Sequence, residues 1–171
     1  MIGLHQVASD ERHLLPGLSA LLIDVVHGGA SVGFLAPLTM ERAMAYWQLV
    51  LASLGSGLVL WVAEDDGTVV GTVQLALVEK ENGRHRGEIQ KLQVLGSYRG
   101  QGLSTRLMAA AEEFAVANGR TLLVLDTEAA SLAESVYRRL GWQRVGEIPQ
   151  YAGKPDGQLI TTVYYYKLLT P

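Results

Sequence analysis

Apolar residues recur at helical spacing in two stretches of the first third of the chain. Between residues 14 and 26 they lie three and four positions apart, which predicts an amphipathic helix. Ser9 or Asp10 offers an N-terminal cap for this helix, and Gly28 ends it. A second helix is expected to begin after Thr39, whose hydroxyl can accept a hydrogen bond from a backbone N–H of the first turn.

Short apolar runs separated by turn sequences follow from residue 58 onward. The runs at 58–63, 68–78 and 87–95 have the length and the β-branched composition of strands. Residues 65–67 and 81–83 lie between them and contain the Asp-Gly and Asn-Gly pairs that are typical of hairpin turns. Three consecutive antiparallel strands are therefore expected.

After residue 95 the pattern changes to a helix followed by a strand. A Gly-rich turn leads into an amphipathic helix over 102–117, and an apolar strand follows at 121–126. Two parallel strands joined by such a helix form a right-handed crossover. A helix at 131–140 and two strands complete the chain, and residues 3–8 form a strand at its start. We therefore expect one α/β domain over residues 1–171, with a mixed sheet and helices on both faces.

Composition and charge disfavour several classes of partner. The 171 residues carry a formal net charge of -3 and no run of Lys and Arg, so nucleic acid is not expected. Cys is absent, and the four His, at positions 5, 13, 27 and 85, form no metal-binding spacing, so no metal is expected. The chain lacks an uninterrupted apolar stretch of ~20 residues and a secretory signal pattern, so no membrane partner and a cytoplasmic location are expected.

A glycine-containing segment from Arg99 to Thr105 lies at the start of the third predicted helix. Gly100 and Gly102 allow backbone angles and a close approach that a side chain would block, so consecutive N–H groups can point at one anion. A plain glycine turn is the alternative interpretation. Two well-known phosphate loops do not match, because Gly-Lys-Ser/Thr is missing and Thr105 stands where a dinucleotide fingerprint needs a third Gly.

The spacing Arg99-x-x-Gly102-x-Ser104 resembles the acetyl-CoA motif of the GNAT family of N-acetyltransferases, in which Gly or Ala takes the last position. The stretch from Ala133 to Trp142 resembles a second GNAT motif, Ala-x-x-x-Tyr-x-x-x-Gly-Phe, with Tyr137 at its aromatic position. Tyr137 alone could also be an ordinary core residue on a helix face. Because both motifs occur in the order that the family has, membership is the favoured interpretation.

The resemblance implies a GNAT-like fold and acetyl-CoA as the cosubstrate. The implied sheet is mostly antiparallel, has about seven strands and contains a splayed pair of parallel strands. The pantetheine arm is expected on exposed backbone of one splayed strand, and the pyrophosphate on the N–H groups of the glycine segment. The residues expected to bind acetyl-CoA are Leu92, Gln93, Val94, Arg99, Gly100, Gln101, Gly102, Leu103, Ser104 and Thr105.

Glu88 lies within one of the splayed strands and Asp126 at the end of the other, so both carboxylates can face one cleft. Such a pair can hold an ammonium and take its proton, which an amine acceptor requires near neutral pH. A solvated strand residue and a helix cap are the alternative interpretations. The resemblance assigns the same base role to Glu88 and Asp126, and it makes Tyr137 the acid that protonates the departing thiolate.

The expected acceptor is the primary amine of a small molecule. The loop after the first helix is expected to line its pocket through His27, Ser31 and Phe34, although a His also suits a helix C-terminus. Four segments resemble a GNAT subgroup that acetylates an amino-bearing β-lactam toxin, at 26–34, 88–92, 125–129 and 144–147. This likeness narrows the expected role to antibiotic or toxin resistance. The sequence does not decide between a monomer and a homodimer.

Two other functions stay open at this level. Residues 29–33 satisfy Gly-x-Ser-x-Gly, the pattern of an esterase elbow with Ser31 as nucleophile, but a helix precedes them and only acids before His85 could complete a triad. The second alternative is an acetyl-CoA-binding sensor domain without turnover, which would keep the glycine segment and lose the acceptor chemistry. The presence of both carboxylates and of Tyr137 favours the enzyme.

Overall fold

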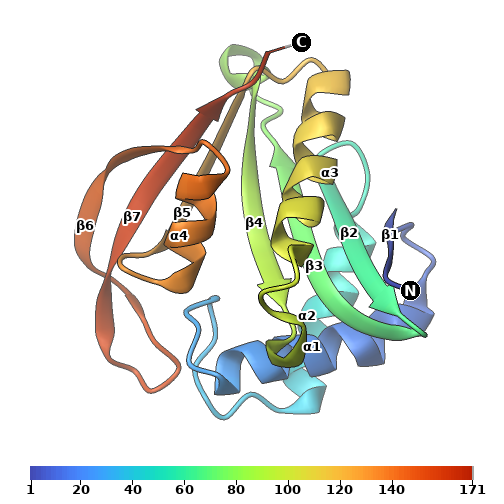
Figure 1. The fold of residues 1–171 in the computed structure, drawn as a ribbon. Helices are drawn as coiled ribbons and strands as arrows, with labels where there is room; N and C mark the ends of the chain where they lie inside the picture. Colours follow the sequence, from blue (N-terminus) through green and yellow to red (C-terminus); the bar gives the residue numbers. More distant parts are fainter. Residues whose placement is uncertain (171) are drawn as a thin grey trace.

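Seven strands form one continuous sheet in the computed structural model, which describes residues 1–170 (Figure 1). Their order across the sheet is β1-β2-β3-β4-β5-β7-β6. Within residues 1–170 only β4 and β5 run parallel, and every other neighbouring pair is antiparallel, so the predicted mixed sheet is confirmed. The strands are β1 (Gly3–Gln6), β2 (Leu58–Asp65), β3 (Thr68–Leu77), β4 (Arg86–Val94), β5 (Leu122–Glu128), β6 (Gln143–Gly153) and β7 (Leu159–Leu168).

Four α-helices lie on the two faces of this sheet, α1 and α2 on one face and α3 and α4 on the other (Figure 1). No helix within residues 1–170 has the length and the apolar character that crossing a membrane requires. The helices are α1 (Leu15–His27), α2 (Met40–Ser53), α3 (Leu103–Ala117) and α4 (Leu132–Arg139).

The N-terminal cap of α2 was predicted correctly from the local sequence, and that of α1 was not. Thr39 caps α2 as predicted, since its Oγ1 accepts a hydrogen bond from the backbone N of Arg42 at 3.3 Å. The prediction that residue 9 or 10 caps the first helix is wrong. A 3-10 turn over Arg12–Leu14 precedes α1, and no side chain caps either start. Pro16 lies in the first turn of α1, where its missing N–H leaves no helical hydrogen bond unmade.

Two apolar cores hold the helices against the sheet. On the first face, Leu22 of α1 and Trp47 of α2 are buried in one cluster with Leu60 of β2. The next residue along β2, Trp61, points to the opposite face and joins the second core, as the twofold periodicity of a strand requires. Each fully buried large apolar side chain contributes roughly 1.5–3 kcal/mol, so both faces are strongly stabilised.

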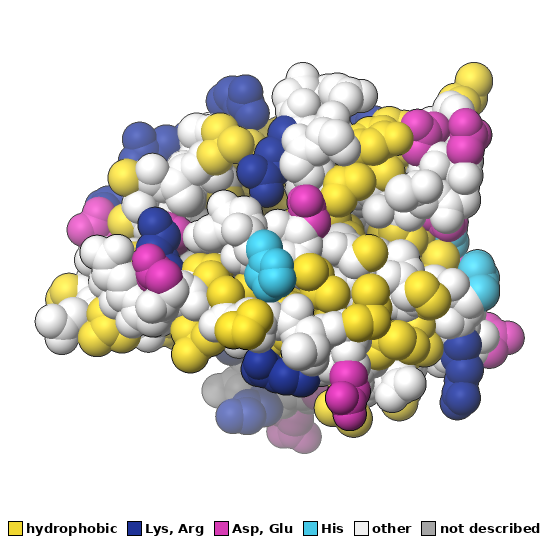
Figure 2. All heavy atoms as spheres, turned by 90° about the horizontal axis from the view of Figure 1, so that it is seen from below, with side chains coloured by type: hydrophobic (Ala, Val, Ile, Leu, Met, Phe, Trp, Pro, Cys, Tyr) yellow, Lys and Arg dark blue, Asp and Glu magenta, His cyan; other side chains and the backbone are white. Residues whose placement is uncertain are grey.

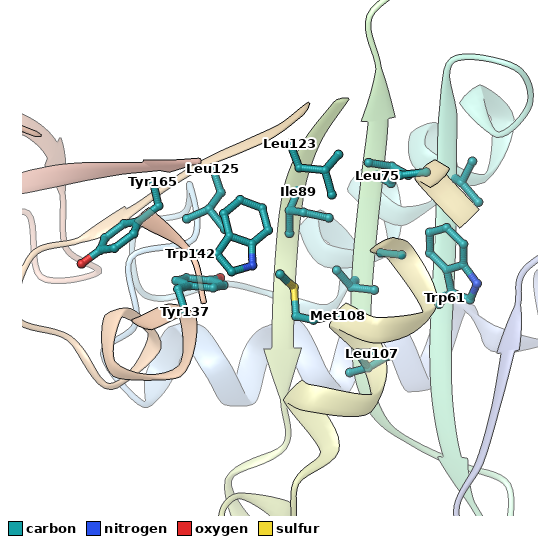
Figure 3. Close-up of a cluster of buried hydrophobic side chains, with 14 of the residues drawn as sticks. Trp61, Leu75, Ile89, Leu107, Met108, Leu123, Leu125, Tyr137, Trp142 and Tyr165 are labelled. Carbon is teal, nitrogen blue, oxygen red and sulfur yellow. The ribbon is translucent and has the colours of Figure 1, made fainter. Parts of the chain in front are cut away.

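The second core lies between the sheet and the helices α3 and α4, as Figure 3 shows. Leu107 and Met108 of α3 lie in it, and Tyr137 of α4 packs near Trp142 with ring centroids 6.1 Å apart. Tyr165 of β7 lies 6.5 Å from the Tyr137 ring. These contacts fix α4 against β5 and β7, and so they place the Tyr137 side chain.

β4 and β5 pair only at their first residues and then separate. Arg86–Glu88 pairs with Leu122–Val124, and the pairing stops at Glu88 although β4 extends to Val94. Figure 1 shows β5, β7 and β6 leaning away from β4 below this point. The splayed parallel pair implied by the family resemblance is therefore present.

Candidate active site

β4 carries a bulge in the stretch where it has left β5. Lys91 and Leu92 together lie opposite a single residue of β3, and Lys91 adopts a left-handed φ of 49°. The hydroxyl of Thr72 donates a hydrogen bond to the carbonyl oxygen of Lys91 at 3.0 Å, which holds the bulge. The backbone from Leu92 to Val94, expected to receive the pantetheine arm, lies on this edge. Its groups that face β5 have no strand partner and can bind an extended ligand.

The glycine segment forms the N-terminus of α3. Gly100 and Gly102 have φ values of 77° and 76°, in the left-handed region, and Gly102 is the N-cap. Within the described chain, no backbone N–H from Gly100 to Thr105 donates to another protein group. A Cβ on either glycine would meet no atom within 4 Å, so the space beside them is open. Free N–H groups, the helix dipole and open space together fit a pyrophosphate.

Glu88 and Asp126 project from the same face of the sheet, the one that α1 and α2 cover. Glu88 is in register with Val124, and Asp126 lies two residues further along β5, so both side chains point the same way. Glu88 is half-buried and Asp126 is exposed. The negative charges of both act on Lys91 and on Tyr164, which places all four groups in one neighbourhood. The two predicted bases are thus brought to one side of the gap.

Tyr137 approaches the gap from the opposite face, on α4. Its side chain is buried, and burial raises the pKa of Tyr137 well above the ordinary value of a tyrosine. The negative charge of Asp126 raises this pKa further. Tyr137 therefore keeps its proton throughout the neutral range, where it can donate a hydrogen bond or act as an acid but cannot act as a base.

Lys91 and Tyr46 also stand in this site, although the sequence pattern did not single them out. The Lys91 Nζ lies 5.9 Å from the centroid of the Tyr46 ring. Gln74 Nε2 donates to the Tyr46 hydroxyl at 3.2 Å, and the Phe34 ring packs edge-on at 5.2 Å, so the ring is held from two sides. Simple alternation after Glu88 puts residue 91 on the other face of the sheet. The bulge turns the Lys91 side chain to the same face as Glu88, and no local sequence pattern predicts the bulge.

A pair of tyrosines borders the same site from β6 and β7. The hydroxyls of Tyr151 and Tyr164 are 2.7 Å apart. This hydrogen bond, with burial and the charge of Asp126, raises the pKa of Tyr164 to about 12. Tyr164 therefore stays neutral and can donate a hydrogen bond to a neighbouring carboxylate or ligand.

The loop between α1 and α2 meets the β6–β7 hairpin around a cavity of about 600 Å³. Ala36 N donates to Pro155 O at 2.8 Å, and Ser31 Oγ donates to Gly153 O at 3.4 Å, so the loop is tied to the hairpin. His27 lines the cavity, but its Nε2 accepts a hydrogen bond from Leu38 N at 3.1 Å. Figure 2 shows this end of the molecule, where apolar side chains surround isolated charged groups.

Of the three residues expected to line the acceptor pocket, only Phe34 lies against the Lys91–Tyr46 pair. His27 Nε2 and Ser31 Oγ form hydrogen bonds with backbone groups. Ser31 also follows a helix and precedes another, so it does not occupy a strand-to-helix elbow, and the esterase interpretation gains no support. Within residues 1–170, no cluster of His, Asp or Glu is arranged to hold a metal ion.

A sheet split between two parallel strands, with a glycine-containing helix start beside the split, is typical of acetyl-CoA-dependent acetyltransferases. A model of the acetyltransferase (GNAT) family matches residues 30–142, more than half of the chain, and the chain belongs to this family. The members of this family are acyltransferases. Acetyl-CoA is the cosubstrate that this fold uses, and the open backbone of β4 and of the glycine segment fits it.

Curated relatives match over part of their length. N-acetyltransferase 8B of Rattus norvegicus is 36% identical over 99 residues, which are 57% of this chain and 44% of that protein. N-acetylaspartate synthetase of Danio rerio is 35% identical over 97 residues, which are 56% of this chain and 33% of that protein. The chain thus matches less than half the length of these relatives.

Solved structures match over nearly the whole chain. An N-acetyltransferase from Staphylococcus aureus Mu50 has a TM-score of 0.81 and 18% identity, with 99% of each chain covered. The Salmonella typhimurium protein yncA, solved with its cofactor acetyl-CoA, has a TM-score of 0.77 and 17% identity, with 100% of this chain and 95% of that chain covered. At these identities the likeness concerns the fold.

Proposed function

We propose that this chain transfers the acetyl group of acetyl-CoA to the primary amine of a small molecule. The observation that carries the proposal is the meeting of three groups at the gap between β4 and β5. Glu88 and Asp126 reach it from one face of the sheet, and Tyr137 reaches it from the other. One carboxylate pair and one protonated phenol on opposite sides of a gap supply a base and an acid for a single transfer.

The carboxylates act on the acceptor. An aliphatic amine is mostly protonated near neutral pH and cannot attack until it loses a proton. Glu88 and Asp126 attract the ammonium and accept this proton, directly or through a water molecule. The amine nitrogen then forms a bond to the acetyl carbon, and the bond from that carbon to sulfur breaks.

Tyr137 acts on the leaving group. When bound, acetyl-CoA supplies the acetyl group and a thiolate that must be protonated. The raised pKa of Tyr137 keeps the phenolic proton available at the pH where the amine is deprotonated. Its position on the face opposite the carboxylates separates the acid from the base, so the proton of the amine and the proton of the thiol follow different routes.

The cosubstrate is held by backbone rather than by charged side chains. The unpaired edge of β4 at Leu92, Gln93 and Val94 is the proposed support for the pantetheine arm. A backbone N–H there would polarise the acetyl carbonyl. The pyrophosphate is assigned to the N–H groups of the glycine segment at the α3 N-terminus, from Arg99 to Thr105.

A narrower role follows from the sequence likeness. The segments at 26–34, 88–92, 125–129 and 144–147 resemble the tabtoxin resistance protein, a GNAT enzyme that acetylates an amino-bearing β-lactam toxin. We extend the proposal to detoxification of a β-lactam amino acid or an antibiotic in the cytoplasm. The protein acts in this role as a monomer or a homodimer.

The test is an acetyl-CoA turnover assay that follows release of the CoA thiol. The acceptors are β-lactam amino acids, short peptides and aminoglycosides. The double variant Glu88→Gln with Asp126→Asn, which keeps the shape of both side chains, serves as the inactive control. Amine-dependent release by the wild type and not by the inactive control is expected. CoA binding without any such release would favour a sensor domain, and ester hydrolysis abolished by Ser31→Ala would favour a hydrolase.

A further inference from the structure

The ammonium of Lys91 stands in the proposed active site without an anionic partner. Among residues 1–170, no carboxylate lies within ion-pair distance of its Nζ, whereas Lys154 pairs with Glu128 at 3.2 Å and Lys167 with Glu112 at 2.7 Å. Lys91 is also half-buried. Removing an ammonium from water costs free energy that a directly paired anion offsets, so a bound anion would stabilise Lys91.

The Lys91 side chain is held in place by three independent features. The bulge in β4, fixed by the hydrogen bond from Thr72, sets the direction of the side chain. The ring of Tyr46 packs beside the ammonium with 5.9 Å between Nζ and the ring centroid. The backbone at Gly33 closes the third side, since a Cβ there would lie 3.6 Å from Nζ. A surface lysine has no comparable set of supports.

Two carboxylates act on Lys91 from beyond ion-pair distance. Burial lowers the pKa of Lys91, and the charges of Asp126 and Glu88 raise it by a smaller amount, so the pKa of Lys91 lies below the ordinary value of a lysine. Neither carboxylate pairs with Nζ directly, so both remain available to an incoming ammonium. The site therefore presents two negative groups and one positive group, separated in space. A molecule that carries one ammonium and one carboxylate is complementary to both parts of this pattern, and a simple amine is complementary only to the two carboxylates.

We propose that Lys91 binds a carboxylate of the acceptor, so that the enzyme acetylates amino acids and related molecules with a free carboxylate in preference to simple amines. The proposal rests on the proposed function, because it takes the acceptor ammonium to lie at Glu88 and Asp126. Tyr46 and Gly33 position the lysine. Thr72 is a positioning residue as well, acting through the backbone of the bulge.

The first experiment compares matched acceptors. Each amino acid of a panel with neutral, acidic and basic side chains is paired with its amide, which keeps the amine and removes the carboxylate. The ratio of kcat/KM for acid over amide is measured for the wild type and for Lys91→Met. We expect this ratio to fall by about tenfold or more in the variant, because a charge-assisted contact is lost for the acid only. Lys91→Arg, which keeps a cation, should retain most of the preference.

The control variant is Lys80→Met, which removes an exposed ammonium within the β3–β4 connection. It should leave the acid-to-amide ratio at the wild-type value. If Lys91→Met also leaves that ratio unchanged while amines are still acetylated, the proposal for Lys91 is overturned and the proposed function stands.

A second measurement does not depend on turnover. N-acetyl amino acids and their amides have no ammonium, so their binding does not need Glu88 or Asp126. Calorimetry should show that the wild type binds the acids more tightly than the amides and that Lys91→Met binds both equally. If the wild type binds acids more tightly than amides but acetylates no acceptor, the proposed function is refuted and the carboxylate site at Lys91 is supported. Equal binding of acids and amides by the wild type would show that Lys91 does not bind a carboxylate.

Discussion

The hydroxyl of Thr72 on β3 donates a hydrogen bond to the backbone carbonyl of Lys91 on β4, at 3.0 Å. Thr72 is fully buried, and its bond holds the one extra residue that β4 contains at this point. Without the bulge, the Lys91 side chain would point to the face of the sheet that α3 covers. A residue of another strand thus determines on which side of the sheet the ammonium stands.

Thr72→Val tests this relationship, since it keeps the branched shape and removes the hydroxyl. The partly buried carbonyl of Lys91 would lose its side-chain donor, so the free energy of unfolding should fall by about 1–3 kcal/mol. The KM for the acceptor should rise more than the KM for acetyl-CoA, because the displaced group faces the acceptor. Urea unfolding and initial rates measure the two effects. Thr72→Ser keeps a hydroxyl and should lie close to the wild type; if Thr72→Val does so too, the hydrogen bond does not hold the bulge.

Gly102→Val should reduce the affinity for CoA. The φ of 76° at this residue is unfavourable for a branched side chain, and the added atoms would stand where a pyrophosphate must approach the N–H groups. Gly119→Val is the matched control, because Gly119 has a φ of 72°, follows α3 at its other end and also has open space beside it. Calorimetry with CoA should show a loss for Gly102→Val only. An equal loss in both variants would mean that strain, and not the glycine segment, weakens binding.

Tyr137→Phe should lower kcat by about a hundredfold or more, with a smaller effect on acetyl-CoA affinity. The hydroxyl acts on the leaving thiolate and does not hold the bound cosubstrate. Because the pKa of Tyr137 is raised, wild-type turnover should not decline through loss of this proton as the pH rises to about 10. Tyr166→Phe, which removes a hydroxyl bonded to Gln143, is the control. Wild-type turnover in Tyr137→Phe would show that water protonates the thiolate.

The double change Glu88→Gln with Asp126→Asn should suppress turnover at neutral pH and restore part of it at alkaline pH. Both carboxylates are lost, but a larger share of the acceptor is already neutral in alkaline solution and needs no base. Either single change should cost less if the remaining carboxylate takes over. The exposed residue Glu113 on α3 provides the control variant Glu113→Gln. A pH–rate profile of the double variant that overlays the wild type would place the base elsewhere.

The order of elements could be predicted from the sequence because each depends on neighbours a few positions away. Thr39 as a helix cap, the hairpin at 65–67 and the strand-helix-strand unit up to β5 all follow from local patterns. The start of α1 could not be predicted in this way, because a 3-10 turn forms where a side-chain cap was expected. The position of β7 between β5 and β6 also lies beyond local patterns, because strand order depends on long-range packing.

The sequence by itself determined the chemical groups of the site: two glycines that tolerate a positive φ, two carboxylates and a tyrosine at family spacing. Only the tertiary structure decided which of them meet and what else joins them. Glu88 and Asp126 share a face because their strands are parallel and in register. Tyr137 reaches them because β4 and β5 separate. Lys91 stands beside them because a bulge, held from β3, overrides the alternation of side chains, and such a contact between distant residues leaves no periodic trace along the chain.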